Sequence, residues 1–211
     1  AMISSVDQSV CRVRERLEQL GIQGHTAIFF TSDNGGLELR QITDNGVIRA
    51  GKGSAYEGGV RVPFIAMIPG VTPAGAVSDV PVIGMDLYAT LLDLAGQTVI
   101  ENDGKNLLPY LRSGDTPIER STIFWHYPHY HPGGATPYSA MRKGDYKLIE
   151  FFESKTLELY DLSSDIGEEH ELSDAQPELT RQLYEELKAW RDEVDAQYPS
   201  ENPDFIDDLN E

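Results

Sequence analysis

The sequence has little cysteine, few positive charges and no long apolar run. Cys11 is the only cysteine in 211 residues, which excludes an intramolecular disulfide and a cysteine-rich zinc site. Lysine and arginine number 17 against 35 acidic residues, so the net charge is -18, and such a surface repels nucleic acids and anionic membranes. No apolar run approaches the roughly 20 residues of a membrane helix. We therefore expect neither a nucleic-acid nor a membrane partner, and an anionic substrate would need local positive charge.

Familiar nucleophile motifs are missing as well. The sequence has no G-x-S-x-G elbow, and Cys11 lies in an amphipathic segment beside several arginines with no histidine close by in sequence. Cys11 is therefore interpreted as structural or incidental. The chain opens directly in that amphipathic pattern, so we expect no signal peptide at its start and expect the chain to be a piece of a longer protein.

The first 120 residues show the alternation of an α/β fold. Apolar residues at helical spacing predict a helix up to Leu20, with Gly21 as its stop. The apolar run 26–31 predicts a strand buried on both faces. A second strand is expected over 60–68, with Pro63 marking an edge or a bulge, and a helix over 81–94. Residues 97–120 are expected to be an irregular connector.

The character of the sequence changes after residue 120. Four short strands separated by tight turns predict an antiparallel sheet, over residues 122–125, 138–141, 146–152 and 156–162. A helix near 177–198 follows. We therefore predict three parts: an α/β part over 1–120, a small antiparallel sheet with a helix over 121–200, and an acidic tail over 201–211.

Asp33 and Asn34 come directly after the first predicted strand. A carboxylate and an amide carbonyl are hard oxygen ligands that suit Ca²⁺ or Mg²⁺, and the carboxyl end of a strand is where α/β sheets bind ligands. Asp-Asn-Gly is also excellent turn chemistry, and the residues alone favour a turn by roughly two to one. Two oxygens cannot complete a shell of roughly six to eight ligands.

Lys52 lies in GVIRAGKGS, which departs from a P-loop only at Gly53. A P-loop must also open a helix, and the following residues, AYEGGVRVP, are not expected to form a stable one. Lys52 could still contact another tetrahedral oxyanion as a point charge. A solvated loop lysine is the ordinary alternative.

The segment FWHYPHYH places His126, His129 and His131 among aromatic residues. Two prolines and the lack of a fourth ligand make a zinc site a weak interpretation. Aromatic faces with imidazole donors would suit a sugar or another ring-bearing substrate. A packed aromatic corner with histidines at the surface is an equally good interpretation.

Three segments together resemble the sulfatase family of the alkaline-phosphatase-like superfamily. These are TSDNGG, the GKGSAYEGGVRVPFI segment about twenty residues later, and the distal RKGDYKLIEF…LELYDLSSDIGEEHEL. The resemblance runs from about Met2 to about Trp190, and it covers only the C-terminal part of the family's architecture. It implies part of an alkaline-phosphatase-like α/β sheet, followed by a four-stranded antiparallel sheet with a packed helix.

The resemblance also implies roles for particular residues. Asp33 and Asn34 would be ligands of an active-site Ca²⁺, and Lys52 would contact the sulfate group as a catalytic and substrate-binding residue. Glu57, Gly58, Gly59 and Arg61 match the same motif and would shape the loop. The three histidines would be specificity residues near the substrate.

The resemblance further implies what is absent. The family's nucleophile is a formylglycine made within C/S-x-P/A-x-R, and the sequence around Cys11 departs from that motif at two positions. We therefore expect the formylglycine, and the remaining metal ligands, in an N-terminal portion that would be a partner of this chain. The expected activity is hydrolysis of a sulfate ester on a sulfated small molecule or carbohydrate, and we expect this chain to be inactive on its own.

Two alternatives stay open at this stage. The chain could derive from a phosphatase or phosphodiesterase of the same superfamily, or it could be a non-catalytic protein that binds a carbohydrate or a partner chain. We also expect self-association, because a truncated sheet should expose an apolar face or edge. Relatives are often exported, to the periplasm or the medium, but the sequence does not determine the compartment.

Overall fold

A computed structural model describes residues 2–38, 42–114, 116–132, 134–200 and 202–203. The chain divides into two compact units: unit 1 comprises residues 1–32 and 63–120, and unit 2 comprises 33–62 and 121–211. The segment that carries the predicted metal and anion residues therefore packs with the C-terminal sheet. The three-part division drawn from the sequence stays a prediction, and most of its acidic tail lies outside the described residues.

The described residues of unit 1 form four helices, one of them a 3₁₀ turn, and one strand pair. The elements are α1 (Met2–Gln19), the 3₁₀ turn η1 (Gln23–His25), β1 (Ile28–Thr31), β2 (Phe64–Met67), α3 (Asp86–Leu94) and α4 (Leu108–Ser113). Strands β1 and β2 pair antiparallel, from Ile28 opposite Met67 to Thr31 opposite Phe64. No helix in the described part of the chain has both the length and the apolar character to cross a bilayer.

Several details of unit 1 differ from the sequence-based expectations. Strand β1 is only partly buried, because β2 is its one partner strand among the described residues and α1 buries none of its own. Strand β2 begins after Pro63, which has no N–H to donate to a ladder. Helix α3 begins at Asp86 rather than near residue 81. The expected irregular connector contains α4, which has Pro109 in its first turn and is capped by Gly114 with φ 72°.

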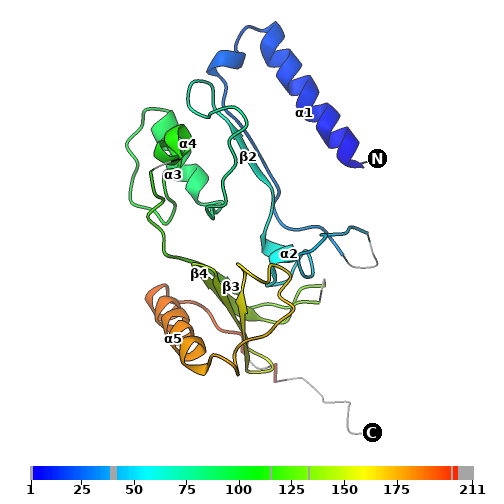
Figure 1. Cartoon of the computed structure of the whole chain (residues 1–211), viewed down its shortest axis with the longest axis vertical. Coiled ribbons are helices and arrows are strands. Elements are labelled where there is room, and N and C mark those ends of the chain that lie inside the picture. The colour runs from blue at the N-terminus through cyan, green and yellow to red at the C-terminus, as the bar shows by residue number, and fades with distance from the viewer. Residues whose placement is uncertain (1, 39–41, 115, 133, 201, 204–211) are drawn as a thin grey trace. The chain divides into compact units, whose positions relative to one another are not determined.

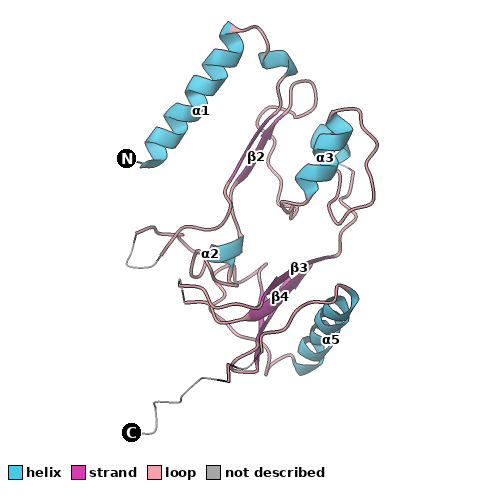
Figure 2. Ribbon diagram, turned by 180° about the vertical axis from the view of Figure 1, so that it is seen from behind, coloured by secondary structure: helices cyan, strands magenta, loops and turns pink. Residues whose placement is uncertain are grey.

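Unit 2 is built on the predicted antiparallel sheet. Its strands are β3 (Thr122–Tyr127), β4 (Tyr138–Lys143), β5 (Tyr146–Phe151) and β6 (Thr156–Asp161), paired in that order. Gly144 and Lys155 have φ values of 58° and 56° in the two tight turns. Helix α5 (Pro177–Glu193) lies along the sheet, as Figures 1 and 2 show from opposite sides. The four strands and the packed helix confirm the fold class expected for this half of the chain.

Both faces of this sheet are covered. Side chains alternate along each strand with a period of two, so neighbouring residues face opposite sides. One face packs against α5 in a buried cluster of Met141, Leu148, Leu159, Leu183 and Leu187. The other face packs against the segment around Ala55, in a cluster with Tyr138, Ala140, Ile149, Tyr160 and Leu162. We call these the α5 face and the loop face.

Candidate functional site

The predicted metal and anion residues lie on two segments of unit 2 that pack backbone against backbone. We call residues 33–36 the Asp33 segment and residues 49–61 the Lys52 segment. The amide of Lys52 donates to the carbonyl of Gly36 at 3.0 Å, and the amide of Gly35 donates to the carbonyl of Gly59 at 3.0 Å. The fold thus brings together residues that are almost twenty positions apart in the sequence.

Glycine is required where the two segments meet. A Cβ atom built on Gly35 would lie 1.6 Å from the carbonyl oxygen of Gly58, and one built on Gly58 would lie 1.9 Å from that of Ala50. No side chain fits at either distance. The glycines therefore permit close approach of two backbones, a requirement beyond the turn chemistry that the sequence suggested.

Asn45 joins the two segments from the side. Its Oδ1 accepts a hydrogen bond from the amide of Gly36 at 3.1 Å. Its Nδ2 donates to the carbonyls of Gly36 at 3.1 Å and Ala50 at 2.8 Å. One side chain thereby satisfies backbone groups of both segments and holds them at a set separation.

Three buried charged residues lie beneath the C-terminal end of the Lys52 segment. Lys147 Nζ lies 2.9 Å from Glu57 Oε1 and 2.9 Å from Glu168 Oε1. The amide of Glu57 donates to Glu168 Oε2 at 2.6 Å. Lys147 and Glu168 are fully buried, and Glu57 is 2% exposed. We call Glu57, Lys147 and Glu168 the buried charge cluster.

The pKa values of the two carboxylates in the cluster are shifted in opposite directions. Burial opposes the charged form of Glu57, but the charges and hydrogen bonds of Lys147 and Arg61 outweigh it and hold the pKa of Glu57 below its ordinary value. For Glu168 burial dominates, Lys147 offsets it only in part, and the pKa is raised. The two residues also differ in their other neighbours, because Arg61 lowers the pKa of Glu57 and the charge of Glu57 raises that of Glu168.

Arg49 anchors the other end of the Lys52 segment. Its Nη1 donates to the hydroxyl of Tyr160 and to the carbonyl of Glu168, both at 2.9 Å. Its guanidinium carbon lies 3.8 Å from the centre of the Tyr56 ring. Burial and the acceptor Glu158 raise the pKa values of Tyr56 and Tyr160, so both stay protonated and donate to the same carboxylate oxygen.

Lys52 itself, between these anchors, is exposed, and so is Asp33. Asn34 is half-buried, and its Nδ2 donates to the carbonyl of Gly35 at 2.9 Å, which places Oδ1 on the opposite side of the amide. A carboxylate beside an amide oxygen fits two positions of a Ca²⁺ shell. Across the described residues, no group of three or more His, Cys, Asp or Glu side chains is arranged to hold a metal ion, so these donors fit only part of a shell.

His131 lies directly against the Lys52 segment. A Cβ atom built on Gly53 would lie 2.0 Å from His131 Nδ1. The ring of Tyr127 lies close to two imidazole rings. Its centroid is 5.4 Å from that of His129 and 6.4 Å from that of His131. His129 is exposed. Imidazole and phenol groups thus border the segment that carries Lys52.

His126 lies on the other face of the sheet. It is one residue from Trp125, which packs in the loop-face cluster, so strand alternation turns it toward the α5 face. Its Nδ1 is 2.6 Å from Ser139 Oγ, and its Nε2 is 2.7 Å from the carbonyl oxygen of Gln197. Both nitrogens are used inside the protein, and substrate binding by His126 stays a prediction.

Cys11 lies in unit 1, on α1, and is exposed. Its Sγ donates to Glu15 Oε1 at 3.5 Å. This hydrogen bond and the negative charge of Glu15 raise the pKa of the thiol. A raised pKa lowers the fraction of reactive thiolate, which agrees with the interpretation of Cys11 as incidental.

Comparisons with known proteins identify the family. The profile of the family described as "N-sulphoglucosamine sulphohydrolase, C-terminal" matches residues 51–193, and the profile described as "Sulfatase" matches residues 1–97. This chain belongs to the sulfatase family. The resemblance inferred from the three sequence segments is thereby confirmed, as is the alkaline-phosphatase-like fold class.

Similar sulfatases are considerably longer than this chain. It is 36% identical to a sulfatase of Formosa agariphila, over 90% of this chain and 38% of the relative. The crystal structure of Ps i-CgsB in complex with k-i-k-neocarrahexaose matches with a TM-score of 0.80 and 33% identity, over 94% of this chain and 43% of that one. A protein solved with its substrate, D-glucosamine-2-N,6-O-disulfate, matches with a TM-score of 0.78 and 26% identity, over 93% and 40%. The chain thus spans about two fifths of these relatives.

Sequence reasoning missed the residues that hold the Asp33 segment and the Lys52 segment together. Lys147, Glu168 and Asn45 were not singled out. One signal for Lys147 was available: in YKLIEF both Leu148 and Ile149 are apolar, which is typical of a strand buried on both faces. A lysine inside such a strand has to be buried with a partner.

The residues after Lys52 also differ from expectation. They form a single helical turn, α2 (Glu57–Val60), where no stable helix was expected. The turn begins five residues after Lys52, and its first amide is already bonded to Glu168. A helix opening at the lysine, which a P-loop requires, is therefore absent from this described segment.

Proposed function

We propose that this chain supplies part of the active site of a sulfatase, with Lys52 as the contact to the sulfate group of the substrate. The observation that carries the proposal is the backbone packing of the Lys52 segment on the Asp33 segment. It presents an exposed lysine from a segment held by Gly36 and Asn45. An acidic protein needs such a local positive charge to bind an anion.

Asp33 and Asn34 would hold a Ca²⁺ ion in this proposal, together with ligands from an N-terminal portion. The ion, when bound, would supply positive charge for the sulfate oxygens. The formylglycine nucleophile would also belong to that portion, because relatives are more than twice as long as this chain. Lys52 would add a point charge to the same anion.

We further propose a sulfated carbohydrate as the substrate. Support comes from the sugar ligands named for two similar structures. It also comes from His131 and Tyr127, whose rings border the Lys52 segment and offer imidazole donors and an aromatic face. His129, which is exposed and lies beside Tyr127, would offer a further imidazole donor to the substrate. No contact supports a direct role for His126.

A sulfate titration followed by NMR tests the role of Lys52. Addition of inorganic sulfate to the chain should shift the amide resonances of Lys52 and its neighbours, and Lys52→Met should abolish most of the shift. Lys155→Met is the matched control, because Lys155 is an exposed lysine of unit 2 that lies in the turn between β5 and β6. Shifts that survive Lys52→Met would contradict the proposal.

Turnover tests the assignment of the nucleophile to another portion. The pure chain, supplied with Ca²⁺ and an aryl sulfate, should show no turnover above the buffer rate. An aryl phosphate assayed in parallel addresses the phosphatase alternative. Robust metal-dependent hydrolysis of either ester by this chain would overturn the proposal that it lacks the nucleophile.

A further inference from the structure

Besides the hydrogen bond of its own amide to Gly36, Lys52 depends on contacts made by residues on either side of it in the segment. At the start, Arg49 is fixed by Tyr160 and by the carbonyl of Glu168. At the end, Glu57 is fixed by Lys147 and by the carboxylate of Glu168. The loop of residues 167–169 therefore contacts both ends. The position of Lys52 depends on groups that do not touch it.

Lys147 is the unusual member of these contacts. It is fully buried on the loop face of β5, with two carboxylate oxygens at 2.9 Å and the Trp125 ring centre 6.0 Å from its Nζ. Desolvation of three charges is expensive, and apolar side chains of similar volume often stabilise a fold equally well. A buried ion cluster is therefore poorly explained by stability alone, whereas its fixed donor and acceptor directions can specify one backbone position.

A short chain of hydrogen bonds connects Glu57 to the surroundings of Lys52. The next residue, Gly58, donates its amide to the carbonyl of Arg49 at 2.8 Å. Gly59 then accepts from the amide of Gly35 in the Asp33 segment, at 3.0 Å. A displacement of Glu57 would therefore shift Gly58 and Gly59, and with them the hydrogen bonds to Arg49 and Gly35. The close packing around Gly58 and Gly59 leaves no space for a Cβ atom at either position.

We propose that Lys147 is a positioning residue, which acts through Glu57 and Glu168 to set the Lys52 segment against the Asp33 segment. This inference rests on the proposed function for the meaning of Lys52, although the positioning itself can be measured without a ligand. Lys147 does not contact the substrate. Its role is to keep the anion-binding lysine and the metal-binding pair at a fixed separation.

Amide hydrogen exchange of a Lys147→Met variant tests the inference. The amides of Lys52, Gly35 and Gly58 should exchange at least about tenfold faster than in the wild type, because their bonds open locally. The amides that pair β4 with β5 should change far less. Acceleration by one common factor over all of unit 2 would overturn the inference, because it would indicate a loss of global stability alone.

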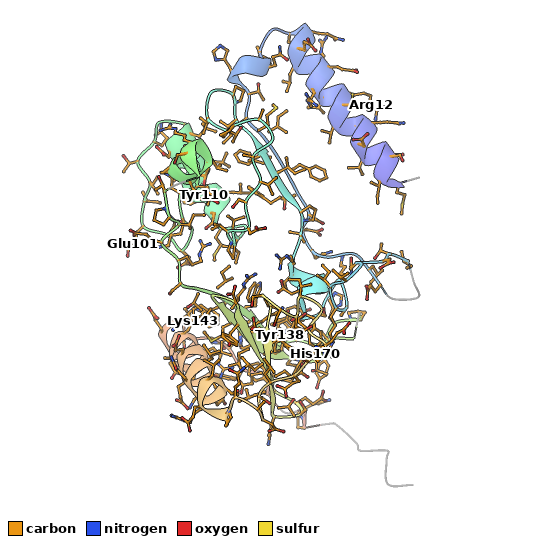
Figure 3. The ribbon with its side chains drawn as sticks, in the orientation of Figure 1. Arg12, Glu101, Tyr110, Tyr138, Lys143 and His170 are labelled. Atoms are coloured by element: carbon orange, nitrogen blue, oxygen red, sulfur yellow. The ribbon has the colours of Figure 1, made fainter. Side chains whose placement is uncertain are left out.

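Lys143→Met provides the matched control. Lys143 also lies in the sheet and pairs with a carboxylate, Glu186 on α5, at 2.6 Å. Figure 3 shows it beside that helix. The control should leave the exchange of the Lys52 amide unchanged. An equal acceleration in both lysine variants would count against a specific role for Lys147.

Two further variants keep the test decisive if Lys147→Met does not fold. Lys147→Arg retains the charge and should keep the Lys52 amide at least about tenfold better protected than Glu57→Gln does. Glu57→Gln retains an acceptor oxygen but loses the charge, and it should accelerate the same three amides. Wild-type protection in Glu57→Gln would overturn the inference.

The sulfate titration separates this inference from the proposed function. Local acceleration together with weaker sulfate binding by Lys147→Met supports both. Local acceleration in a wild-type chain that binds no sulfate would refute the role of Lys52 and still support its positioning. Unchanged exchange beside normal sulfate binding would refute the positioning and leave the proposed function standing.

Discussion

Gly53 has no room for a methyl group. Its φ is 86°, in the left-handed region, and its missing Cβ would overlap the His131 ring. We predict that Gly53→Ala lowers the free energy of unfolding of unit 2 by about 1–2 kcal/mol from backbone strain and by about 1–3 kcal/mol from overpacking. Urea unfolding followed by tryptophan fluorescence measures this, because Trp125 and Trp190 both lie in unit 2.

Gly46→Ala separates the two contributions. Gly46 has φ 68° and no atom within 4 Å of a built Cβ, so its substitution costs strain alone. Combining Gly53→Ala with His131→Ala should recover the overpacking cost. If Gly53→Ala and Gly46→Ala cost the same, the contact between Gly53 and His131 is not formed in solution.

The buried charge cluster predicts a particular dependence of stability on pH. The pKa of Glu57 is lower in the folded state, so its contribution is complete above the unfolded value of about 4.3 and is lost as the pH falls through the folded value. In the Glu57→Gln variant, the free energy of unfolding should therefore decrease less steeply as the pH falls below about 4.3. Urea midpoints measured between about pH 3 and pH 6 test this expectation.

Glu168→Gln should produce the opposite change. The raised pKa of Glu168 means that its ionisation disfavours the folded state as the pH rises from the unfolded value to the folded one. Without this carboxylate, the free energy of unfolding should increase more steeply with rising pH over that range. Parallel pH profiles of the two glutamine variants would contradict the assigned directions.

Among the elements, α3 depends on one buried carboxylate. Asp86 is fully buried at the start of the helix and accepts from the amides of Ile83 at 2.9 Å and Lys105 at 2.8 Å. Arg120 Nη1 donates to its Oδ2 at 3.0 Å. Asp86→Ala leaves this buried guanidinium unpaired, and we predict a loss of about 3–5 kcal/mol from the unfolding free energy of unit 1.

Amide exchange of α3 measures that loss without interference from unit 2. Asp93→Asn is the control, since Asp93 is exposed on the same helix and bonds Asn106 at 2.7 Å. It should change the exchange rates less than about tenfold. Equal effects of both substitutions would show that Asp86 does not organise the helix.

At the scale of the whole molecule, α1 presents an apolar surface to solvent. It buries none of its residues, and Ile3 and Val13 are 86% and 56% exposed. An apolar helix face of this kind is typical of an interface. We predict concentration-dependent self-association through α1, or its coverage by an N-terminal portion where one is present.

Sedimentation velocity of the chain over a wide concentration range tests this expectation. Val6→Glu with Val13→Glu should shift the equilibrium toward monomer, while Arg12→Glu, on the same helix, should act more weakly because it removes no apolar area. A single monomeric species at high concentration would contradict the prediction.

Much of the fold and part of the site could be predicted from local patterns. Helix α1, the four strands of unit 2 and α5 follow from periodicity and turn residues, because these depend on neighbours within a few positions. The exceptions have local causes: α4 is too short to show a period, and β1 lacks the covering layer that its apolar run suggested. The resemblance rested partly on Gly35, Gly58 and Gly59, where close backbone contacts in this chain leave no room for a Cβ atom.

The sequence by itself determined the family, the fold class and the residue types at Asp33, Asn34 and Lys52. Only the tertiary structure decided which residues support them. Because side chains alternate along a strand, His126 lies on the α5 face of the sheet and Lys147 on the loop face. The register of the strands places Lys147 beside Glu57. The physical reason is that burial and charge pairing arise between residues about 90 positions apart, so no local pattern encodes them.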